Sequence, residues 1–540
     1  MVRLPGAFAV CAWAAVIAAD RFSLRGAAMP ITTEVNYQLA MPPLTMPNRL
    51  AQAQSLYLRK HAENPIDWWP WCEEVLTTAR KDQRLIFLSV GYSSCHWCTV
   101  MEGEAFSDPE IADYLNTYFF PIKVDREERP DLDSIYMQAL QMMTGQGGWP
   151  MNLFLSPENL VPFYGGTYFP LEPRYGRPGF LQVLEAVRRY YNQEHGKVRS
   201  LQTELLDHLQ QAVQLQPLQQ LPANLLQTGV EQNTGVIAAA GVGPCFPMMP
   251  YANLALQGTV YWDSREQAYR VCAQRGQDLA LGGIYDHVGG GFHRYTVDAT
   301  WTVPHFEKML YDNGQIMEFF ANLWSAGVKE PALERAIAGT VQWLKREMRS
   351  PQGYFYAAQD ADSFIQATAP EPEEGAFYVW DYRDLERLLQ EKELANLQAA
   401  FTVTPQGNFE GQNVLQRRHL GLLSDEVEAA IAQLFAQRYG TLPNGIETFP
   451  PALDNQAARS HPWPGRIPPV TDPKMIVAWN SLIISGLARA ATVWQQPNYL
   501  QLATDAAQFI LDHQWQGGGY TASIMMVPPR SWPRRKTMPC

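Results

Sequence analysis

Two cysteines shortly after an apolar run, Cys95 and Cys98, constrain the fold of this chain more than any other feature. Residues 85–90 have the pattern of a short buried β-strand, and the residues from Thr99 onward have helical spacing. A strand that passes into a helix here places the first thiol at a helix N-terminus, where the helix dipole lowers the pKa of a thiol. The second thiol, three residues later, faces the same side and can close a disulfide.

Redox chemistry suits this pair better than a metal site. A zinc site needs two further ligands, and the sequence has no second Cys-x-x-Cys pair to supply them. The other cysteines are too scattered for a disulfide framework. We therefore predict that Cys95 is the attacking nucleophile and Cys98 the resolving thiol, with no metal and no cofactor. His96, if protonated, would lower the thiol pKa further. The alternative is a pair of buried structural cysteines.

Strand and helix patterns alternate around the cysteine pair. We expect helices over 73–81, from Thr99 onward and over 131–143, and strands over 85–90, 119–124 and 151–155. This order is that of the thioredoxin fold, which we place at residues 46–178. Pro150, directly before the last strand, is where such folds place a cis peptide that faces the two cysteines.

The second half of the chain is predicted to be mainly helical. Helical segments recur in pairs over 316–326 with 332–348, 382–401, 426–439, 476–494 and 499–513. Repeated pairs without intervening strands favour helical hairpins closed into an (α/α)6 toroid, which we place at residues 241–525. A helical connector is expected over 179–240, and the basic, proline-broken residues 526–540 form an atypical tail. We expect the toroid to lack its last helices.

The loops of this helical part carry a second group of candidate residues. We expect them to gather at one mouth of the toroid, where a base could remove a proton beside a carbonyl or a carboxyl pair could flank a glycosidic bond. The alternative is that they cap neighbouring helices and shape tight loops. The candidates are His287, His293, Arg294, His305, Glu307, Asp360 and Asp362.

Charge and hydropathy limit the partners. A formal net charge of −12 repels nucleic acid and anionic membranes, so we expect neither as a partner. Residues 1–45 form a leader in which Gly6 to Ala19 resembles a signal-peptide core, unless translation starts at a later methionine. We expect a cytoplasmic protein, or a secreted or periplasmic one if residues 1–19 act as a signal peptide. The sequence leaves the oligomeric state open.

Several short sequence motifs, in the order in which they occur here, resemble those of the spermatogenesis-associated protein 20 (DUF255) family. They are Asn64 to Trp68, Gly91 to Cys98, Lys123 to Asp131, Thr144 to Pro150, Gly165 to Pro170, His287 to Lys308, Asp360 to Ser363, Gly407 to Gly411 and Ala478 to Asn480. The resemblance implies a thioredoxin-like domain joined to a toroid of the six-hairpin glycosidase type, similar to N-acylglucosamine 2-epimerases. The chain departs from the family at Thr99, where a histidine is usual, and over 241–247.

Two functions of different classes follow. The first is thiol-disulfide exchange or redox sensing with a protein thiol or disulfide as partner. The second is a sugar epimerase, a glycosidase-like enzyme or a sugar-binding protein, in which the thioredoxin-like domain is regulatory and the partner is a small sugar. A catalytically silent interaction protein is the third alternative. In thioredoxin a buried carboxylate six residues before the first cysteine helps move protons, whereas this chain has Ser89 there.

Overall fold

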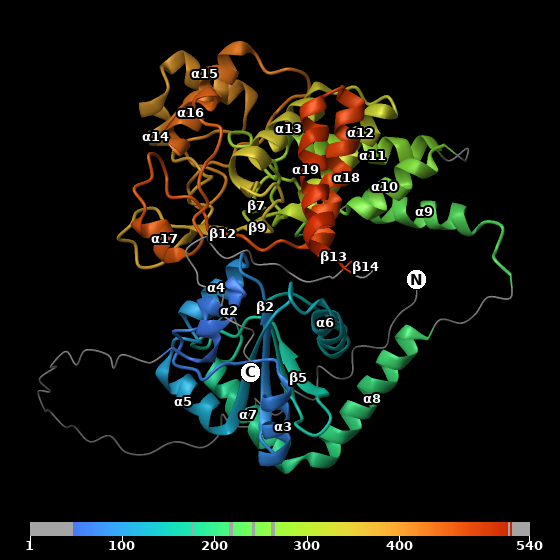
Figure 1. The fold of residues 1–540 in the computed structure, drawn as a ribbon, viewed down its shortest axis with the longest axis vertical. Helices are drawn as coiled ribbons and strands as arrows, with labels where there is room; N and C mark the ends of the chain where they lie inside the picture. Colours follow the sequence, from blue (N-terminus) through green and yellow to red (C-terminus); the bar gives the residue numbers. More distant parts are fainter. Residues whose placement is uncertain are drawn as a thin grey trace, which may run out of the picture. The chain divides into compact units, whose positions relative to one another are not determined.

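A computed structural model describes residues 47–174, 176–214, 220–239, 243–260, 265–516 and 519–520. The chain divides into two compact units, with the boundary between residues 217 and 218 (Figure 1). The expected leader and the expected tail, residues 1–45 and 526–540, lie outside the described residues. The expected connector over 179–240 is shared between the two units.

The first unit is built on a five-stranded sheet in the order β1-β3-β2-β4-β5. β1 and β2 run parallel to β3, while β4 is antiparallel to β2 and to β5. Every residue of β2 and β3 is buried, which is why both strands are mainly apolar in the sequence, with Ser89, Lys123 and Asp125 as the exceptions. The strands are β1 (Trp69–Pro70), β2 (Leu85–Gly91), β3 (Phe119–Asp125), β4 (Met151–Leu155) and β5 (Pro162–Gly166).

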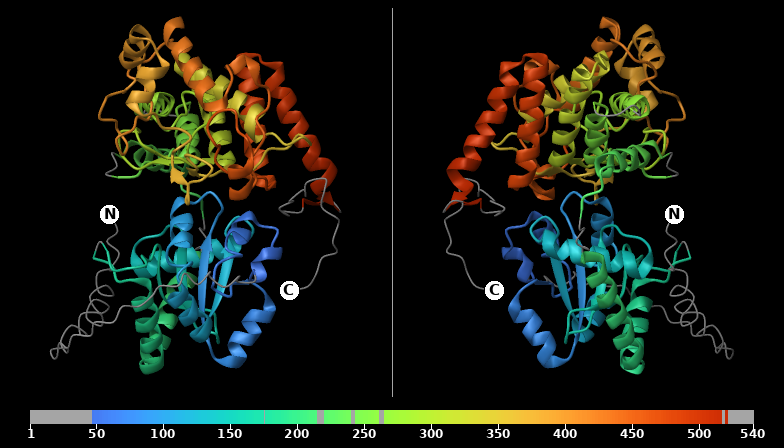
Figure 2. Two further views of the ribbon diagram at one scale, coloured as in Figure 1. Left: turned by 90° about the vertical axis from the view of Figure 1, so that its left-hand side faces the viewer. Right: turned by 90° about the vertical axis from the view of Figure 1, so that its right-hand side faces the viewer.

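Helices cover both faces of this sheet (Figures 1 and 2). Ile86, Leu88 and Val90 of β2 pack in one cluster with residues of α3 and α6. Phe87 points to the opposite face, where its ring lies 5.4 Å from that of Phe180 in α7. The helices of this unit are α2 (Leu56–Lys60), α3 (Glu73–Asp82), α4 (His96–Gly103), α5 (Pro109–Tyr118), α6 (Pro130–Thr144), α7 (Phe180–Gln193) and α8 (His195–Val213).

These elements confirm the thioredoxin-like fold expected from the sequence. The strand order, the helix that begins directly after Cys95 and the three predicted strands all agree with it. The peptide bond between Trp149 and Pro150 is cis, as predicted. β4 begins with Met151 opposite Val90, so Pro150 lies at the end of β2 from which the cysteine segment continues.

The second unit is mainly helical, which confirms the second part of the expected fold class. α12 packs beside α18, α18 beside α19, and α10 beside both α9 and α12. A Cβ on Gly314 of α12 would lie 2.7 Å from backbone atoms of Ile483 and Leu482, so glycine is what lets α12 and α18 approach so closely. The α-helices described in this unit are α9 (Leu225–Ala238), α10 (Met249–Gly258), α11 (Arg265–Leu281), α12 (Leu310–Ser325), α13 (Pro331–Trp343), α14 (Tyr382–Leu388), α15 (Glu391–Ala400), α16 (Asp425–Tyr439), α17 (Asn455–Ser460), α18 (Val477–Trp494) and α19 (Pro497–Gln514).

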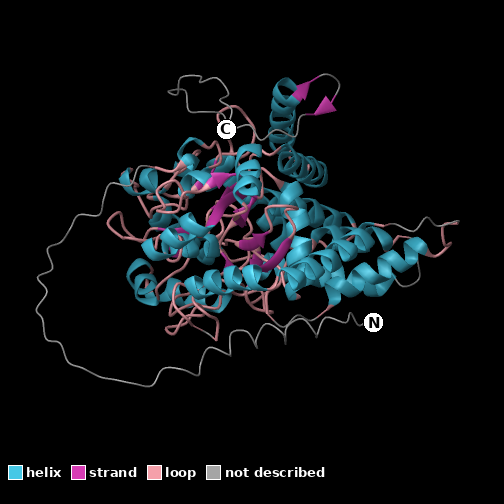
Figure 3. Cartoon of the chain, turned by 90° about the horizontal axis from the view of Figure 1, so that it is seen from below, coloured by secondary structure: helices cyan, strands magenta, loops and turns pink. Residues whose placement is uncertain are grey.

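Short strands connect these helices, which differs from the expected succession of helices alone. β8 (Lys308–Met309), β9 (Ala358–Gln359) and β12 (Thr471–Asp472) form a three-stranded sheet. Two-stranded pairs join β6 (Tyr295–Thr296) to β7 (Pro304–His305), and β10 (Asp362–Ser363) to β11 (Glu373–Glu374). A last pair, β13 (Trp515–Gln516) with β14 (Gly519–Tyr520), follows the end of α19 (Figure 3). Strands of two residues are too short to leave a periodic pattern in a sequence.

Candidate functional site

The cysteine pair forms a disulfide at the N-terminus of α4. Cys95 is the N-cap residue, and the backbone N–H of Cys98 donates to Cys95 Sγ over 3.2 Å. The two Cα atoms are 5.2 Å apart, within the usual range for a disulfide. Only 3% of Cys95 and 2% of Cys98 are exposed, whereas Trp97 between them is 46% exposed. The two sulfur atoms are therefore buried, and the exposed surface next to them is that of Trp97.

Aromatic and charged side chains surround the disulfide in the first unit. The Trp97 ring lies 5.1 Å from the ring of Tyr168, whose hydroxyl donates to Glu104, the C-cap residue of α4. The ring of Trp149, which precedes the cis proline, stacks under the Arg126 guanidinium at 3.9 Å. His96 is partly exposed, and its ring lies 5.4 Å from that of Trp97.

A buried lysine lies beneath the pair, and the sequence reasoning did not select it. Lys123 of β3 is 1% exposed, and its Nζ donates to Ser89 Oγ of β2 over 3.1 Å. Burial lowers the pKa of Lys123 well below its ordinary value, and Glu102 only partly opposes this. A charged residue within the apolar run of residues 119–124 was the signal that could have found it.

Four of the candidate residues in the second unit lie together. Glu307 is fully buried and accepts a hydrogen bond from Arg294 Nη1 over 2.9 Å. His305 Nε2 is 3.7 Å from Glu307 Oε1, while His305 Nδ1 contacts Glu374. Asp362 is paired with Glu374 in the register of β10 and β11, so the two residues lie on the same face of that ribbon.

His287 and His293 have different surroundings. Nε2 of His287 bonds to the carbonyl oxygens of Leu281 and Gly282, at 3.2 and 3.0 Å. Nδ1 of His293 bonds to the carbonyl oxygen of Phe306 over 2.8 Å. Burial is the main cause that lowers the pKa of both histidines to about 3, with nearby cations adding to it. Both rings are thus neutral at neutral pH and bridge backbone segments.

Asp360 and Asp362 are both buried, each with 4% exposed. Oδ1 of Asp360 accepts the backbone N–H of Asp362 over 3.4 Å. The backbone N–H of Asp360 in turn donates to the Val470 carbonyl over 2.8 Å. Asp360 therefore shapes the loop between β9 and β10, whereas Asp362 is on the strand that carries it toward Glu374.

A larger buried charge cluster in this unit was missed. Asp286 accepts two hydrogen bonds from Arg438 Nη1, at 2.9 and 2.7 Å, and one from Lys308 Nζ at 2.9 Å. Burial opposes the charge on Asp286, but the two cations hold its pKa well below the ordinary value. Glu347 is bound by Arg346 and by the hydroxyl of Tyr439. Asp286 and Arg438 are 152 residues apart, and no local pattern connects them.

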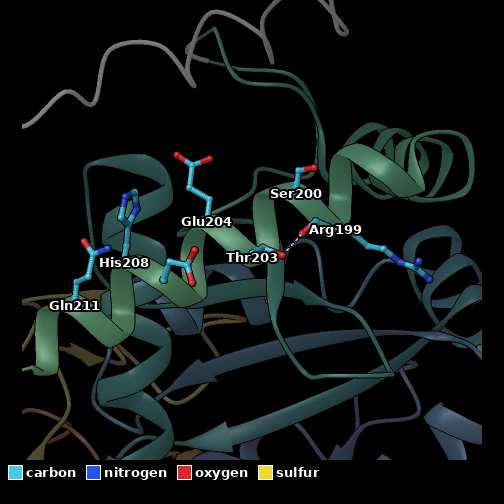
Figure 4. Close-up of a pocket in the computed structure, with 7 residues that line it drawn as sticks. Arg199, Ser200, Thr203, Glu204, His208 and Gln211 are labelled. Carbon is cyan, nitrogen blue, oxygen red and sulfur yellow. Dashed lines mark hydrogen bonds between the residues drawn. The ribbon is translucent and has the colours of Figure 1, made fainter.

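Other possible sites in the described residues carry less chemistry. Within those residues, no group of three or more His, Cys, Asp or Glu side chains is placed to hold a metal ion. None of the helices described is long and apolar enough to cross a membrane. Figure 4 shows a polar hollow along α8, where Thr203 Oγ1 donates to the Arg199 carbonyl over 2.9 Å. Its lining residues all come from this one helix: Arg199, Ser200, Thr203, Glu204, Asp207, His208 and Gln211.

Solved structures offer only weak likenesses. A thioredoxin from Thermus thermophilus is 23% identical, covers 24% of this chain and 93% of its own length, and has a TM-score of 0.20. Cellobiose 2-epimerase from Spirochaeta thermophila is 15% identical, covers 56% of this chain and 90% of its own length, and also has a TM-score of 0.20. The fold assignment therefore rests on the strand order, the cis proline and the packed helices described above.

Sequence comparison gives a stronger relationship. Residues 47–210 match a family model described as "Protein of unknown function, DUF255". Spermatogenesis-associated protein 20 of Homo sapiens is 38% identical over 510 residues, which cover 88% of this chain and 62% of the human protein. The chain thus spans less than two thirds of that relative's length. These matches confirm the resemblance expected from the motifs: the chain is similar to spermatogenesis-associated protein 20 over 510 residues, and residues 47–210 match the DUF255 model.

Proposed function

We propose that the chain performs thiol-disulfide exchange with a protein partner at Cys95 and Cys98. The observation that carries the proposal is the disulfide at the N-terminus of α4, in a thioredoxin-like unit whose cis Pro150 lies at the same end of the sheet. A helix N-terminus stabilises the thiolate that Cys95 must become to attack. Trp97 offers an exposed apolar surface beside the sulfurs for a partner to contact.

The exchange takes place in two steps. In the reducing direction, the Cys95 thiolate attacks a disulfide of the partner, a mixed disulfide forms, and one partner thiolate leaves. Cys98 then attacks Cys95 Sγ, the intramolecular disulfide forms, and the second partner thiolate leaves. The partner disulfide gains the two electrons that the dithiol gives up. The same steps in reverse oxidise a partner, and the reduction potential of the pair sets the direction.

A trapping experiment tests this proposal. Cys98→Ser in the full chain leaves the mixed disulfide unresolved, so partners should accumulate in a covalent complex that dithiothreitol releases. The Cys95→Ser variant is the matched control and should trap nothing. In parallel, the wild-type protein should reduce insulin disulfides and Cys95→Ser should not. Exchange is excluded if no partner is trapped and glutathione disulfide does not measurably oxidise the pair.

A second candidate function is supported by the cluster in the second unit. His305 contacts two carboxylates, Glu307 and Glu374, and Arg294 neutralises one of them. An imidazole held between carboxylates can accept and return a proton, as isomerisation of a sugar beside its carbonyl requires. Thermal unfolding against a panel of mono- and disaccharides tests for a sugar ligand, since a ligand bound by the folded state raises the melting temperature. A shift that His305→Gln abolishes supports a sugar site, and no shift with any sugar contradicts it.

A further inference from the structure

A column of buried polar groups extends from Cys98 into the core of the first unit. A Cβ on Gly91 would lie less than 3.0 Å from both Tyr57 Oη and Cys98 Sγ, so these two atoms are neighbours across the space above Gly91. Ser89 is two residues earlier on β2 and faces the same side as Gly91. Lys123 is paired with Ser89 in the register of β2 and β3, and its Nζ donates to Ser89 Oγ.

Tyr57 joins the two ends of this column. Its side chain comes from α2, is 1% exposed, and places Oη beside Cys98. Burial is the main cause that raises the pKa of Tyr57 well above its ordinary value, Asp125 adds to this, and the nearby Ser89 side chain opposes it. The phenol therefore keeps its proton, so that it can pass one proton on as it receives another. Tyr57 Oη forms no hydrogen bond with another described residue, so a relay through it requires the hydroxyl to turn toward Cys98 and Ser89.

The surroundings of Lys123 favour its neutral amine. No carboxylate of the described residues forms an ion pair with it; its Nζ lies over the rings of Phe106, Trp68 and Tyr57, at 4.1, 4.6 and 5.4 Å. The attraction between an ammonium and such ring faces is weaker than the hydration that the ammonium loses on burial. A neutral amine has a lone pair that can accept a proton, so Lys123 can take a proton in this position.

Other titratable groups face Lys123 from the neighbouring elements. Glu102 of α4 attracts the charged form, and its carboxylate accepts a hydrogen bond from Asn64 over 2.9 Å. His61, at the end of α2, has a pKa held well below its ordinary value, first by burial and then by Lys123. Asp125, two residues along β3, accepts hydrogen bonds from the Ser55 hydroxyl over 2.6 Å and from the Glu127 backbone over 2.9 Å.

We infer that the Lys123 amine receives the proton of Cys98, relayed through Tyr57 Oη and Ser89 Oγ, when Cys98 resolves the mixed disulfide. The inference rests on the proposed exchange at Cys95 and Cys98. As Cys98 Sγ loses its proton, it attacks Cys95 Sγ, the partner leaves as a thiolate, and Lys123 becomes an ammonium. That proton returns through the same column when the disulfide is next reduced. Lys123 is then a positioning residue for the proton, because it acts on the sulfur through Tyr57 and Ser89.

The test separates the two chemical steps in the full chain. The reduced protein is mixed with the aromatic disulfide DTNB in a stopped-flow instrument, and release of the coloured thiolate is followed from pH 6 to pH 9. Attack by Cys95 releases the first thiolate and resolution by Cys98 releases the second, which Cys98→Ser should abolish. Lys123→Met and Tyr57→Phe should slow the second phase about 100-fold at pH 7, because a positioned general base typically accelerates a step by at least that factor. Both variants should leave the first phase unchanged.

The pH profile distinguishes a proton acceptor from a structural residue. In the wild type the second phase should level off near neutral pH, whereas in Lys123→Met it should keep rising about tenfold per pH unit, as hydroxide alone removes the proton. Lys81→Met, on the exposed face of α3, controls for loss of a positive charge, and Asp125→Asn controls for the nearby carboxylate.

Three results overturn the inference. Wild-type rates and profile in both Lys123→Met and Tyr57→Phe exclude the relay but leave the exchange standing. A profile altered by Asp125→Asn and not by Lys123→Met assigns the base to Asp125. Release of a single thiolate by the wild type overturns the exchange and the inference together. If Lys123→Met does not fold, the profile of Tyr57→Phe decides, because that variant removes one hydroxyl only.

Discussion

The second unit should lose stability in mild acid because it buries two neutral histidines. The pKa of His287 and His293 is lowered to about 3 in the folded chain, against about 6.5 in an unfolded one. Between these values the unfolded state binds a proton that the folded state does not. The free energy of unfolding therefore falls as the pH drops below about 6.5, and continues to fall until about pH 3.

The magnitude follows from the size of the two shifts. One pKa unit corresponds to about 1.4 kcal/mol, so at pH 5 each histidine lowers the free energy of unfolding by about 2 kcal/mol, and both together by about 4 kcal/mol. Asp286 does not contribute between pH 7 and pH 5, because its pKa is lowered in the folded chain and its stabilising effect is lost only as the pH falls below about 3.8, its ordinary value. The expected loss is a large fraction of the stability of an ordinary domain.

Two substitutions isolate this effect from other titrations. His287→Gln keeps an N–H at the position of Nε2 for the carbonyls of Leu281 and Gly282, and His293→Asn keeps one at the position of Nδ1 for Phe306. Each variant should lose some stability at every pH and about half of the difference between pH 7 and pH 5. Pulsed hydrogen exchange of α12 and α18 peptides during a urea titration measures this. The reasoning is refuted if either variant keeps the full pH dependence of the wild type.

Further substitutions test the packing and charge arguments. Gly91→Ala should destabilise the first unit by about 1–3 kcal/mol through overpacking, whereas Gly196→Ala, with open space around it in α8, should be neutral or stabilising in hydrogen exchange of the same unit. Asp286→Asn should lower the stability of the second unit by about 3–5 kcal/mol, because it leaves two buried cations without a carboxylate. Asp384→Asn, in an exposed ion pair, should lower it by at most about 1 kcal/mol. Equal losses in urea unfolding would contradict this argument. Cys272, whose pKa burial raises to about 12, should resist alkylation at pH 8 until the chain is unfolded, as read by mass spectrometry, and fast labelling would contradict its burial.

The sequence predicted the first unit well because its strands are buried on both faces. Residues 85–90, 119–124 and 151–155 became β2, β3 and β4 almost residue for residue. Such strands are mainly apolar, and the cysteine pair fixed where the sheet passes into a helix. The cis proline could be placed because its position relative to the last strand is part of the same fold.

Prediction was weaker where distant segments determine the structure. The helix expected over 382–401 is divided into α14 and α15, because Leu389 is extended and the backbone N–H of Gln390 bonds to Glu393 at the start of the new helix. Asp286 and Arg438 are 152 residues apart in the sequence, and no periodic pattern indicates that their segments are in contact. Sequence reasoning selected histidines by residue type, and only the structure shows that His287 and His293 bond to backbone carbonyls while His305 contacts carboxylates.

Two of the buried lysines, Lys123 and Lys308, should respond oppositely to the same substitution. Lys308 is fully buried and donates to Asp286 over 2.9 Å, so Lys308→Met removes one of the cations that allow a carboxylate in the core. Lys123 has a hydroxyl and aromatic rings around it, and Lys123→Met replaces a poorly solvated amine with an apolar side chain of similar length. Hydrogen exchange should therefore show a loss of about 2 kcal/mol or more in the second unit for Lys308→Met, and no loss in the first unit for Lys123→Met. An equal loss for both would mean that Lys123 is held as a structural cation. A stable Lys123→Met that still fails to resolve the mixed disulfide would instead leave chemistry as the reason for a lysine within an apolar strand.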